Sequence, residues 1–493
     1  MLRQRLGVLC KLSWQLLRLR FSGGPDKDHR SRRLLFEQFK HLGGVYIKFL
    51  QMLSLNVDFL QGWASPSEFD VFEAVDYETI DVTKTLQAEV PHYSQQFLSV
   101  DVQPFAAGSF AQVYRGQLLD GTDVIIKILR PSLTRNLDFD LRLLAIITRV
   151  ASWLYPTTIT NANVVYRQFA VTTRAETDYI TEARNARWFH EYFRNVAEIV
   201  IPKTFQDLSS EHVIVQEFIG GISVAELLSV QKQGYDPAVI VQQKLGSDLW
   251  QQLQSLGYEF LKSTVLADFV IGDPHPGNIK LLPDNKVGLI DFGIAAPAPR
   301  NRQAFLNLIY EYQKLYNEAF DAHSFTIAML SFFDEALVQA LTTVGKLMNP
   351  SEPIDFMNMI GSAAAQTLTG KMHQANTQTL LRRKMMSRLF GQTINSQNRF
   401  GVYLNLQAMN VFKAAHIYLS TVGSLGKNGE NFIVLQRAIN DTIATIERVG
   451  IALETPSNPL STDQSVELVS GWLARLADND PFLFQQLTAT ISL

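Results

Sequence analysis

Apolar residues recur at helical spacing along most of the chain, and one region replaces this spacing with short apolar runs typical of strands. The helical spacing extends over residues 34–61, 137–154, 161–192, 245–266 and most of 301–450. Strand-like runs begin near Asp101 and include 124–129 and 213–219. The pattern therefore predicts an α+β protein in which a small β-rich part is followed by a large helical part.

Turn-forming residues separate these runs. Asp120-Gly121 predicts a tight hairpin turn, and Gly220-Gly221 ends the run at 213–219. A polar linker and one last helix at 466–477 are expected at the C-terminal end. The apolar stretch 328–333 is closed by two acidic residues, so we expect a buried helix there and find no convincing transmembrane helix in the sequence.

Composition narrows the class of protein. An apolar share of 46% and a charged share of 18% are typical of a folded globular chain with a sizeable core. The formal net charge of −3 gives no reason to expect a nucleic-acid partner. The one cysteine, Cys10, excludes a disulfide framework and a cysteine-based zinc site, and it favours a reducing compartment.

The charge is concentrated at the N-terminus. Residues 1–33 hold nine Lys or Arg and two Asp, a local charge of +7. Leucine and aromatic residues are interspersed with these basic residues, which is typical of a helix on an anionic membrane surface. A transit peptide would also be rich in Arg and poor in acids, and a solvated arm is the third interpretation.

The stretch that carries the chemistry is Gly272-Asp273-Pro274-His275-Pro276-Gly277-Asn278, which Asp291-Phe292-Gly293 follows. In kinases a catalytic-loop Asp positions the nucleophile, and an Asn five residues later and the Asp of a DFG hold Mg²⁺. Asp273, Asn278 and Asp291 have that spacing. The residues between them predict a β-hairpin that returns Asn278 and Asp291 to the same end. We therefore assign Asp273 as catalytic, and Asn278 and Asp291 as metal ligands.

A loop of small residues precedes a strand that contains a single lysine. Small side chains let the backbone approach phosphates closely, and Lys127 on its strand would pair with the α and β phosphates of ATP. The alternative is a solvent-facing lysine on an edge strand. The run 213–219 is expected to supply the hinge beside the adenine. The predicted ATP-binding residues are Ala106, Ala107, Gly108, Ser109, Phe110, Val113, Lys127, Glu217 and Ile219.

A glutamate is expected to orient Lys127. In the predicted helix at 161–192, Asp178, Glu182 and Asn185 fall on one face and Glu176 on another. We assign Glu182 as the partner of Lys127, with a solvated acidic face as the alternative.

The segment after Gly293 is short. Only residues 294–299 precede the next predicted helix, and no Ala-Pro-Glu tripeptide follows. Regulated protein kinases carry a longer activation segment there, which docks a peptide. The sequence therefore argues against protein substrates.

These motifs, in this order, resemble the UbiB-type atypical kinases, a family linked to coenzyme Q and isoprenoid-lipid metabolism in bacteria, mitochondria and plastids. The resemblance covers roughly residues 35–330. The family's KxGQ helix, Ala-rich loop, ExD motif with its helix Glu, catalytic loop and DFG correspond to Lys48-Phe49-Leu50-Gln51, residues 106–109, Glu176-Thr177-Asp178 with Glu182, Asp273 to Asn278, and Asp291 to Gly293.

The resemblance implies a bilobal protein-kinase-like fold, with a small β-rich N-lobe, a large helical C-lobe and an N-terminal helical extension. It also implies a regulatory lid that covers the nucleotide and restricts peptide phosphorylation. In such a lid, Lys48 would meet Glu176 or Asp178, and Gln51 would lie over the nucleotide.

Three residues depart from the family pattern. Leu50 replaces a Gly, Gly108 replaces the third Ala of the loop, and Ile271 replaces a His two residues before the catalytic Asp. Gly108 makes the loop more like an ordinary kinase Gly-rich loop. Every group expected to touch metal or phosphate is retained, so we do not interpret the chain as a dead pseudokinase.

We expect a Mg²⁺- and ATP-dependent kinase or ATPase that supports ubiquinone or other isoprenoid-lipid biosynthesis at a membrane surface, in the cytoplasm or in an organelle if the N-terminus is a transit peptide. The expected partners are ATP, an isoprenoid or quinone-precursor lipid, an anionic membrane surface and a lipid-biosynthetic protein complex. The alternatives are a small-molecule kinase of the aminoglycoside or choline type and a non-catalytic, ATP-gated scaffold. The expected segments are a basic arm at 1–33, a helical extension at 34–98, an N-lobe at 99–219 and a C-lobe at 220–493.

Overall fold

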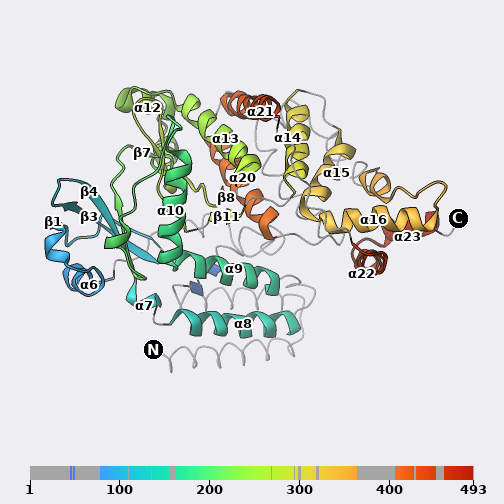
Figure 1. Cartoon of the computed structure of the whole chain (residues 1–493), viewed down its shortest axis with the longest axis horizontal. Helices are drawn as coiled ribbons and strands as arrows, with labels where there is room; N and C mark the ends of the chain where they lie inside the picture. Colours follow the sequence, from blue (N-terminus) through green and yellow to red (C-terminus); the bar gives the residue numbers. More distant parts are fainter. Residues whose placement is uncertain are drawn as a thin grey trace. The chain divides into compact units, whose positions relative to one another are not determined.

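The computed structural model describes residues 45–46, 48–49, 78–108, 110–134, 136–154, 162–267, 269–293, 295–297, 301–317, 321–362, 406–426, 429–450 and 460–491. The chain divides into two compact units (Figure 1). The strand-rich unit comprises Met1–Phe189 and Pro202–Phe218, and the helical unit comprises His190–Ile201 and Ile219–Leu493. The segment boundaries expected from the sequence stay predictions.

An antiparallel sheet forms the centre of the strand-rich unit. Its strands are β1 (Phe97–Val100), β2 (Ala106–Ala107), β3 (Ala111–Leu118), β4 (Asp123–Leu129) and β6 (Val213–Glu217). The order is β1-β3-β4-β6, and β2 pairs with β3. The first strand therefore begins at Phe97, before the position near Asp101 that the sequence predicted. Val102 and Phe105, which we had included in the strand pattern, lie in the following loop and are 70% and 50% exposed.

Alternation along β4 decides which side chains face the core. Val124, Ile126 and Ile128 are buried in one cluster with residues of helix α6 (Val82–Glu89). Because successive side chains of a strand point to opposite faces, Lys127 lies on the other face of the sheet. The predicted hairpin turn between β3 and β4 is present, with Gly121 at φ 86°.

Besides α6, the described helices of the strand-rich unit are α7 (Pro131–Thr134), α8 (Leu137–Leu154), α9 (Ala162–Glu176) and the larger part of α10 (Tyr179–Phe193), and short 3₁₀ turns lie at Tyr93–Gln95 and Gln206–Leu208. Figure 1 shows α8 and α9 side by side. The described part of the N-terminal extension packs on this pair: the Tyr46 hydroxyl donates to Asp140 at 3.0 Å, and the rings of Phe49 and Phe169 lie 5.1 Å apart.

The single helix predicted at 161–192 is wrong, because the structure has two helices there. Helix α9 ends at Glu176, and α10 begins at Tyr179. The Asp178 carboxylate accepts hydrogen bonds from the backbone N–H and the hydroxyl of Thr181 at 3.0 and 2.7 Å. An aspartate that caps its own helix start favours a new helix over continuation of the old one. Asp178 therefore does not share a helical face with Glu182 and Asn185, contrary to the prediction from the sequence.

The helical unit contains two small sheets. One has the order β5-β10-β9-β7, and the other pairs β11 with β8. Their strands are β5 (Ile199–Val200), β7 (Ile222–Ser223), β8 (Phe269–Ile271), β9 (Ile279–Leu281), β10 (Val287–Leu289) and β11 (Ala295–Pro297). The predicted hairpin is the antiparallel pair β9–β10, in which Leu289 lies opposite Ile279. A 3₁₀ turn at Pro276–Asn278 leads into β9.

The other elements in the described part of this unit are helices. They are α11 (Val224–Lys232), α12 (Pro237–Leu245), α13 (Leu249–Leu266), α14 (Arg302–Tyr316), α15 (Ala322–Phe333), α16 (Glu335–Met348), α20 (Leu406–Leu425), α21 (Glu430–Val449), α22 (Thr462–Asn479) and α23 (Pro481–Ile491). The predicted buried helix at 328–333 is the end of α15. The prediction of one last helix was wrong, since α22 and α23 follow one another. Both lie beside α16 in Figure 1. The three helices share an apolar cluster around the buried Trp472.

Among the described residues, no single helix is long and apolar enough to cross a membrane. The helices His323–Phe333 and Glu335–Met348, bent by 112°, meet the length and composition criteria only when taken together.

Candidate functional site

Lys127 and Glu182 form an ion pair inside the strand-rich unit. Lys127 sits in the centre of the sheet, opposite Val113 on β3 and Ile214 on β6. Its Nζ donates to Glu182 Oε1 at 2.8 Å, and the two side chains are 12% and 5% exposed. The alternative of a solvent-facing lysine on an edge strand is therefore wrong, because β4 is flanked on both sides. A solvated acidic face is likewise wrong for Glu182.

The loop of small residues begins as strand β2. Ala106 pairs with Val113, and the Gly108 N–H donates to the Ala111 carbonyl at 2.8 Å. A Cβ on Gly108 would find the Ala111 carbonyl oxygen 3.8 Å away, an ordinary contact, so the fold does not require glycine there. Phe110 is buried, with 6% exposure. Ser109 lies outside the described residues.

Lys48 contacts the same loop from the N-terminal extension. It forms an ion pair with Glu176, and its Nζ lies 4.4 Å from the centre of the Phe110 ring. A cation over an aromatic face is attracted by the negative face of the ring. Of the two acids that the resemblance offered, the structure places Lys48 against Glu176, while Asp178 caps α10. Gln51 lies outside the described residues.

The end of β6 carries the residues predicted to contact adenine. Glu217 is exposed and pairs with Val124, and Ile219 is half-buried in the helical unit. Sequence reasoning missed Arg115, whose guanidinium carbon lies 4.2 and 4.4 Å from the centres of the Phe105 and Phe218 rings. The residues around it on β3 gave no signal of this stacking, because Phe105 and Phe218 lie in other segments of the chain.

The catalytic loop of the helical unit lies between β8 and β9. Asp273 is half-buried, and its Oδ1 is fully buried with no hydrogen-bond partner among the described residues. The Asn278 side-chain amide donates to the Asp273 backbone carbonyl at 3.4 Å. A buried carboxylate oxygen without a donor requires an explanation. The simplest is an acceptor reserved for a ligand hydroxyl or water.

The hairpin brings the second metal-ligand candidate to the same end. The Ile290 N–H donates to the Asn278 carbonyl at 3.1 Å, so Asp291 follows directly after a residue bonded to Asn278. Asp291 is exposed, and its Oδ1 accepts from the Gly293 N–H at 3.0 Å. Phe292 is buried beneath it. An amide oxygen and an exposed carboxylate are ligands that suit Mg²⁺, which also keeps water and phosphate oxygens.

The far end of the hairpin is anchored to α13. Asp284 and Asn285 adopt φ values of 59° and 57° in the turn. The Asn285 carboxamide oxygen accepts from the Asp248 N–H at 2.7 Å, and the Gln252 amide donates to the Leu282 and Lys286 carbonyls at 2.8 and 2.7 Å. These bonds hold the hairpin on a long helix. They therefore also restrain Asn278 and Asp291 at the other end of the hairpin.

Lys413 of α20 is a functional candidate that sequence reasoning missed. Its Nζ lies 3.8 Å from Asp273 Oδ2, and the side chains are 37% and 26% exposed. The two residues are 140 positions apart, so no local spacing relates them. The sequence feature that could have drawn attention to Lys413 is its position as the single lysine in an otherwise apolar stretch, Val411 to Ala415.

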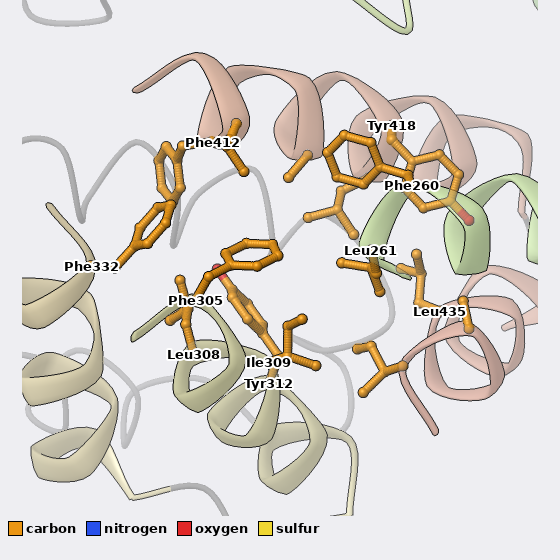
Figure 2. A pocket seen from close by; sticks show the side chains of 15 residues that line it. Phe260, Leu261, Phe305, Leu308, Ile309, Tyr312, Phe332, Phe412, Tyr418 and Leu435 are labelled. Carbon is orange, nitrogen blue, oxygen red and sulfur yellow. The ribbon is translucent and has the colours of Figure 1, made fainter. Parts of the chain in front are cut away.

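Helices α13, α14, α15, α20 and α21 line an apolar cavity of about 60 Å³ (Figure 2). Figure 2 shows aromatic side chains around it, among them Phe260, Phe305, Phe332 and Phe412. Its polar atoms are turned away or bonded: the Tyr418 hydroxyl donates to the Leu253 carbonyl at 2.7 Å. Such a cavity holds apolar groups in preference to water.

A family model for the ABC1 atypical kinase-like domain matches residues 72–320, just over half of the 493-residue chain. The chain is 27% identical over 363 residues to the Arabidopsis thaliana protein ACTIVITY OF BC1 COMPLEX KINASE 3, chloroplastic, covering 68% of this chain and 49% of the relative. It is 28% identical over 320 residues to a probable protein kinase UbiB of Aliivibrio fischeri, covering 61% and 54%. The chain thus spans about half the length of the curated relatives it matches.

A solved structure of a Mycobacterium tuberculosis protein in complex with erythromycin is similar to this chain with a TM-score of 0.45 at 18% identity, covering 80% of this chain and 90% of the other.

Proposed function

This chain belongs to the ABC1 atypical kinase-like family, and from that premise we propose that it binds Mg²⁺ and ATP and transfers the γ-phosphoryl group to a hydroxyl or to water. The kinase-like fold class predicted from the sequence is confirmed by the family match. The observation that carries the proposal is the Asp273 carboxylate, whose buried Oδ1 lies in a loop held by Asn278 and next to the strand pair that ends at Asp291.

We assign different tasks to the two units. In the strand-rich unit, Lys127 holds the α and β phosphates, and Glu182 orients it through the 2.8 Å ion pair. The small-residue loop from Ala106 to Gly108, with Phe110 and Val113, covers the phosphates, and Glu217 and Ile219 serve the adenine. In the helical unit, Asn278 and Asp291 hold Mg²⁺, which neutralises charge on the phosphates when bound.

Asp273 acts on the nucleophile. Its Oδ1 accepts a hydrogen bond from the attacking hydroxyl or water and takes that proton as the reaction proceeds. The nucleophile's oxygen forms a bond to the γ-phosphorus, the bond from that phosphorus to the bridging oxygen breaks, and ADP leaves. Oδ1 has no hydrogen-bond donor among the described residues, so its lone pairs are available to the nucleophile.

The regulatory lid also belongs to this proposal. The ion pair of Lys48 with Glu176 and the contact of Lys48 with Phe110 support an extension that restrains the phosphate loop. We propose that this extension limits turnover. Lys48→Met removes both contacts while keeping the length of the side chain, so it should change the ATPase rate. An unchanged rate would contradict the proposal that the extension limits turnover.

For the wider role, we propose that an isoprenoid or quinone-precursor lipid is the partner, at a membrane surface engaged by residues 1–33. The names of the UbiB relatives and the apolar cavity support this role. At about 60 Å³ the cavity is smaller than the engineered cavity of about 150 Å³ that holds benzene, so it takes only a short branched alkyl end. Ala415→Leu should fill it and remove stimulation of turnover by isoprenoid mimics.

The experiment that separates catalysis from binding compares two conservative variants. Asp273→Asn should bind Mg²⁺-ATP like the wild type but lose turnover by about 10²–10⁴-fold, as expected for removal of a positioned base. Asp291→Asn should lose binding as well. If Asp273→Asn retained full function in a complementation assay while Asp291→Asn did not, the chain would be an ATP-gated scaffold and not a phosphotransferase.

A further inference from the structure

Asp273 has one charged partner among the described residues, and that partner comes from a distant helix. Lys413 Nζ lies 3.8 Å from Asp273 Oδ2. Lys413 lies outside residues 72–320, the part of the chain that the family model matches. The catalytic loop itself contains no lysine or arginine from Ile271 to Asn278. The positive charge at the loop therefore comes from α20.

The two oxygens of the Asp273 carboxylate differ in their surroundings. Oδ2 faces the Lys413 ammonium, whereas Oδ1 is buried and has no donor among the described groups. Burying a carboxylate oxygen without a donor is costly unless a nearby charge offsets the loss of solvation. A cation on the Oδ2 side supplies that offset, and it leaves the Oδ1 lone pairs available to a nucleophile.

The fold holds Lys413 in this place. Helix α20 packs against β8 and β11, the strands that precede Asp273 and follow Gly293. Its neighbouring positions Phe412 and Ala414 are buried. Farther along α20, the Tyr418 hydroxyl reaches the Leu253 carbonyl of α13 at 2.7 Å.

A glycine leaves room for this hydroxyl. A Cβ on Gly257 of α13 would lie 2.2 Å from the Tyr418 hydroxyl oxygen, so a larger residue there would displace the end of the Tyr418 side chain. Helix α20 is thus bonded to α13, the helix that also anchors the catalytic hairpin. This shared contact fixes the backbone of Lys413 relative to that hairpin.

We propose that Lys413 is a positioning residue for phosphoryl transfer. It orients the Asp273 carboxylate, with Oδ2 toward the ammonium and Oδ1 toward the nucleophile. This inference rests on the proposed phosphotransferase or ATPase function. At 3.8 Å the contact is a charge interaction and not a tight hydrogen bond. An arginine at position 413, which keeps the charge and has a similar length, should therefore substitute for the lysine.

The test is a set of variants of the full chain, assayed for ATP turnover and for Mg²⁺-ATP binding. Lys413→Met should lower kcat by about 10–100-fold, part of the 10²–10⁴-fold that a positioned base contributes, and should leave ATP affinity unchanged. Lys413→Arg should recover most of the rate because it keeps the charge. Lys346→Met, the same change at an exposed lysine of α16, is the matched control and should behave as wild type.

A double-mutant cycle shows whether Lys413 acts through Asp273. In the Asp273→Asn background, Lys413→Met should cause no further loss, since the carboxylate it serves is gone. Thermal unfolding of each variant controls for folding. The inference is overturned if Lys413→Met turns ATP over at the wild-type rate, if it loses the same factor in both backgrounds, or if it weakens ATP binding. A wild-type chain that binds Mg²⁺-ATP but turns none over would overturn the proposed function and this inference together.

Discussion

Gly221 is the residue at which a single methyl group should disturb the catalytic hairpin most. It lies immediately before β7, which pairs with β9 through Ile222 and Leu281. Its φ is +84°, and a Cβ built there would lie 2.2 Å from the Leu281 carbonyl oxygen and 2.7 Å from Leu282 Cδ2. Strand β9 begins directly after Asn278, so displacement of β9 reaches the metal-ligand candidate.

Gly221→Ala therefore combines two costs. The positive φ costs a non-glycine residue about 1–3 kcal/mol, and overlap with a backbone carbonyl that cannot rotate away adds about 1–3 kcal/mol. The free energy of unfolding should fall by about 2–6 kcal/mol. Because 1 kcal/mol shifts Tm by roughly 2–4 °C in a domain of 150–250 residues, Tm should fall by roughly 4–24 °C.

The adjacent glycine provides the control. A Cβ on Gly220 would meet nothing within 4 Å, and its φ is not positive. Differential scanning calorimetry and ATP turnover should be measured for both alanine variants. We expect Gly220→Ala to match the wild type and Gly221→Ala to lose both stability and turnover. Equal Tm values for the two variants would refute the argument that β9 is held by close approach of the chain at Gly221.

Three further predictions concern single side chains. Glu182→Gln removes the charge 2.8 Å from Lys127 Nζ and should weaken ATP binding by about tenfold or more, measured by titration calorimetry; unchanged affinity would refute the pairing. Gly108→Ala should leave the free energy of unfolding equal or raise it by about 0.4–1 kcal/mol, while its methyl group weakens ATP binding. Burial raises the pKa of Glu259, with Lys262 opposing, above the ordinary value of 4.5, so the native state favours its protonated form. The contribution of Glu259 to stability should therefore be greatest below that value and fall as pH rises through the raised pKa. Glu259→Gln should remove this part of the pH dependence in urea unfolding, and an identical pH profile would contradict the assignment.

Much of the fold followed from local patterns. The hairpin at 279–290, the strand that carries Lys127 and the helix at 137–154 were predicted from apolar periodicity and turn residues, and the structure confirms them. The spacing of Asp273, Asn278 and Asp291 predicted which residues share one end of the hairpin. These features are encoded within about twenty residues, where spacing alone determines which side chains meet.

The features that the sequence did not predict depend on a side-chain cap or on contacts between distant segments. The break at Asp178 was missed because apolar spacing continues across it, while a side-chain cap starts a new helix. Lys413 was missed because its partner lies far away in the sequence. The contact of Lys48 with Glu176 joins segments 128 positions apart, and it was expected only from the family resemblance, since no spacing rule links them.

The central claim is that the metal-dependent binding of ATP uses Asp291. The most direct measurement is titration calorimetry of ATP into the full-length chain, with and without Mg²⁺, for the wild type and Asp291→Asn. The account predicts binding that requires Mg²⁺ in the wild type and is lost in the variant, whose fold should be intact because Asp291 is exposed. Binding of equal strength in both proteins, or binding indifferent to Mg²⁺, would contradict it.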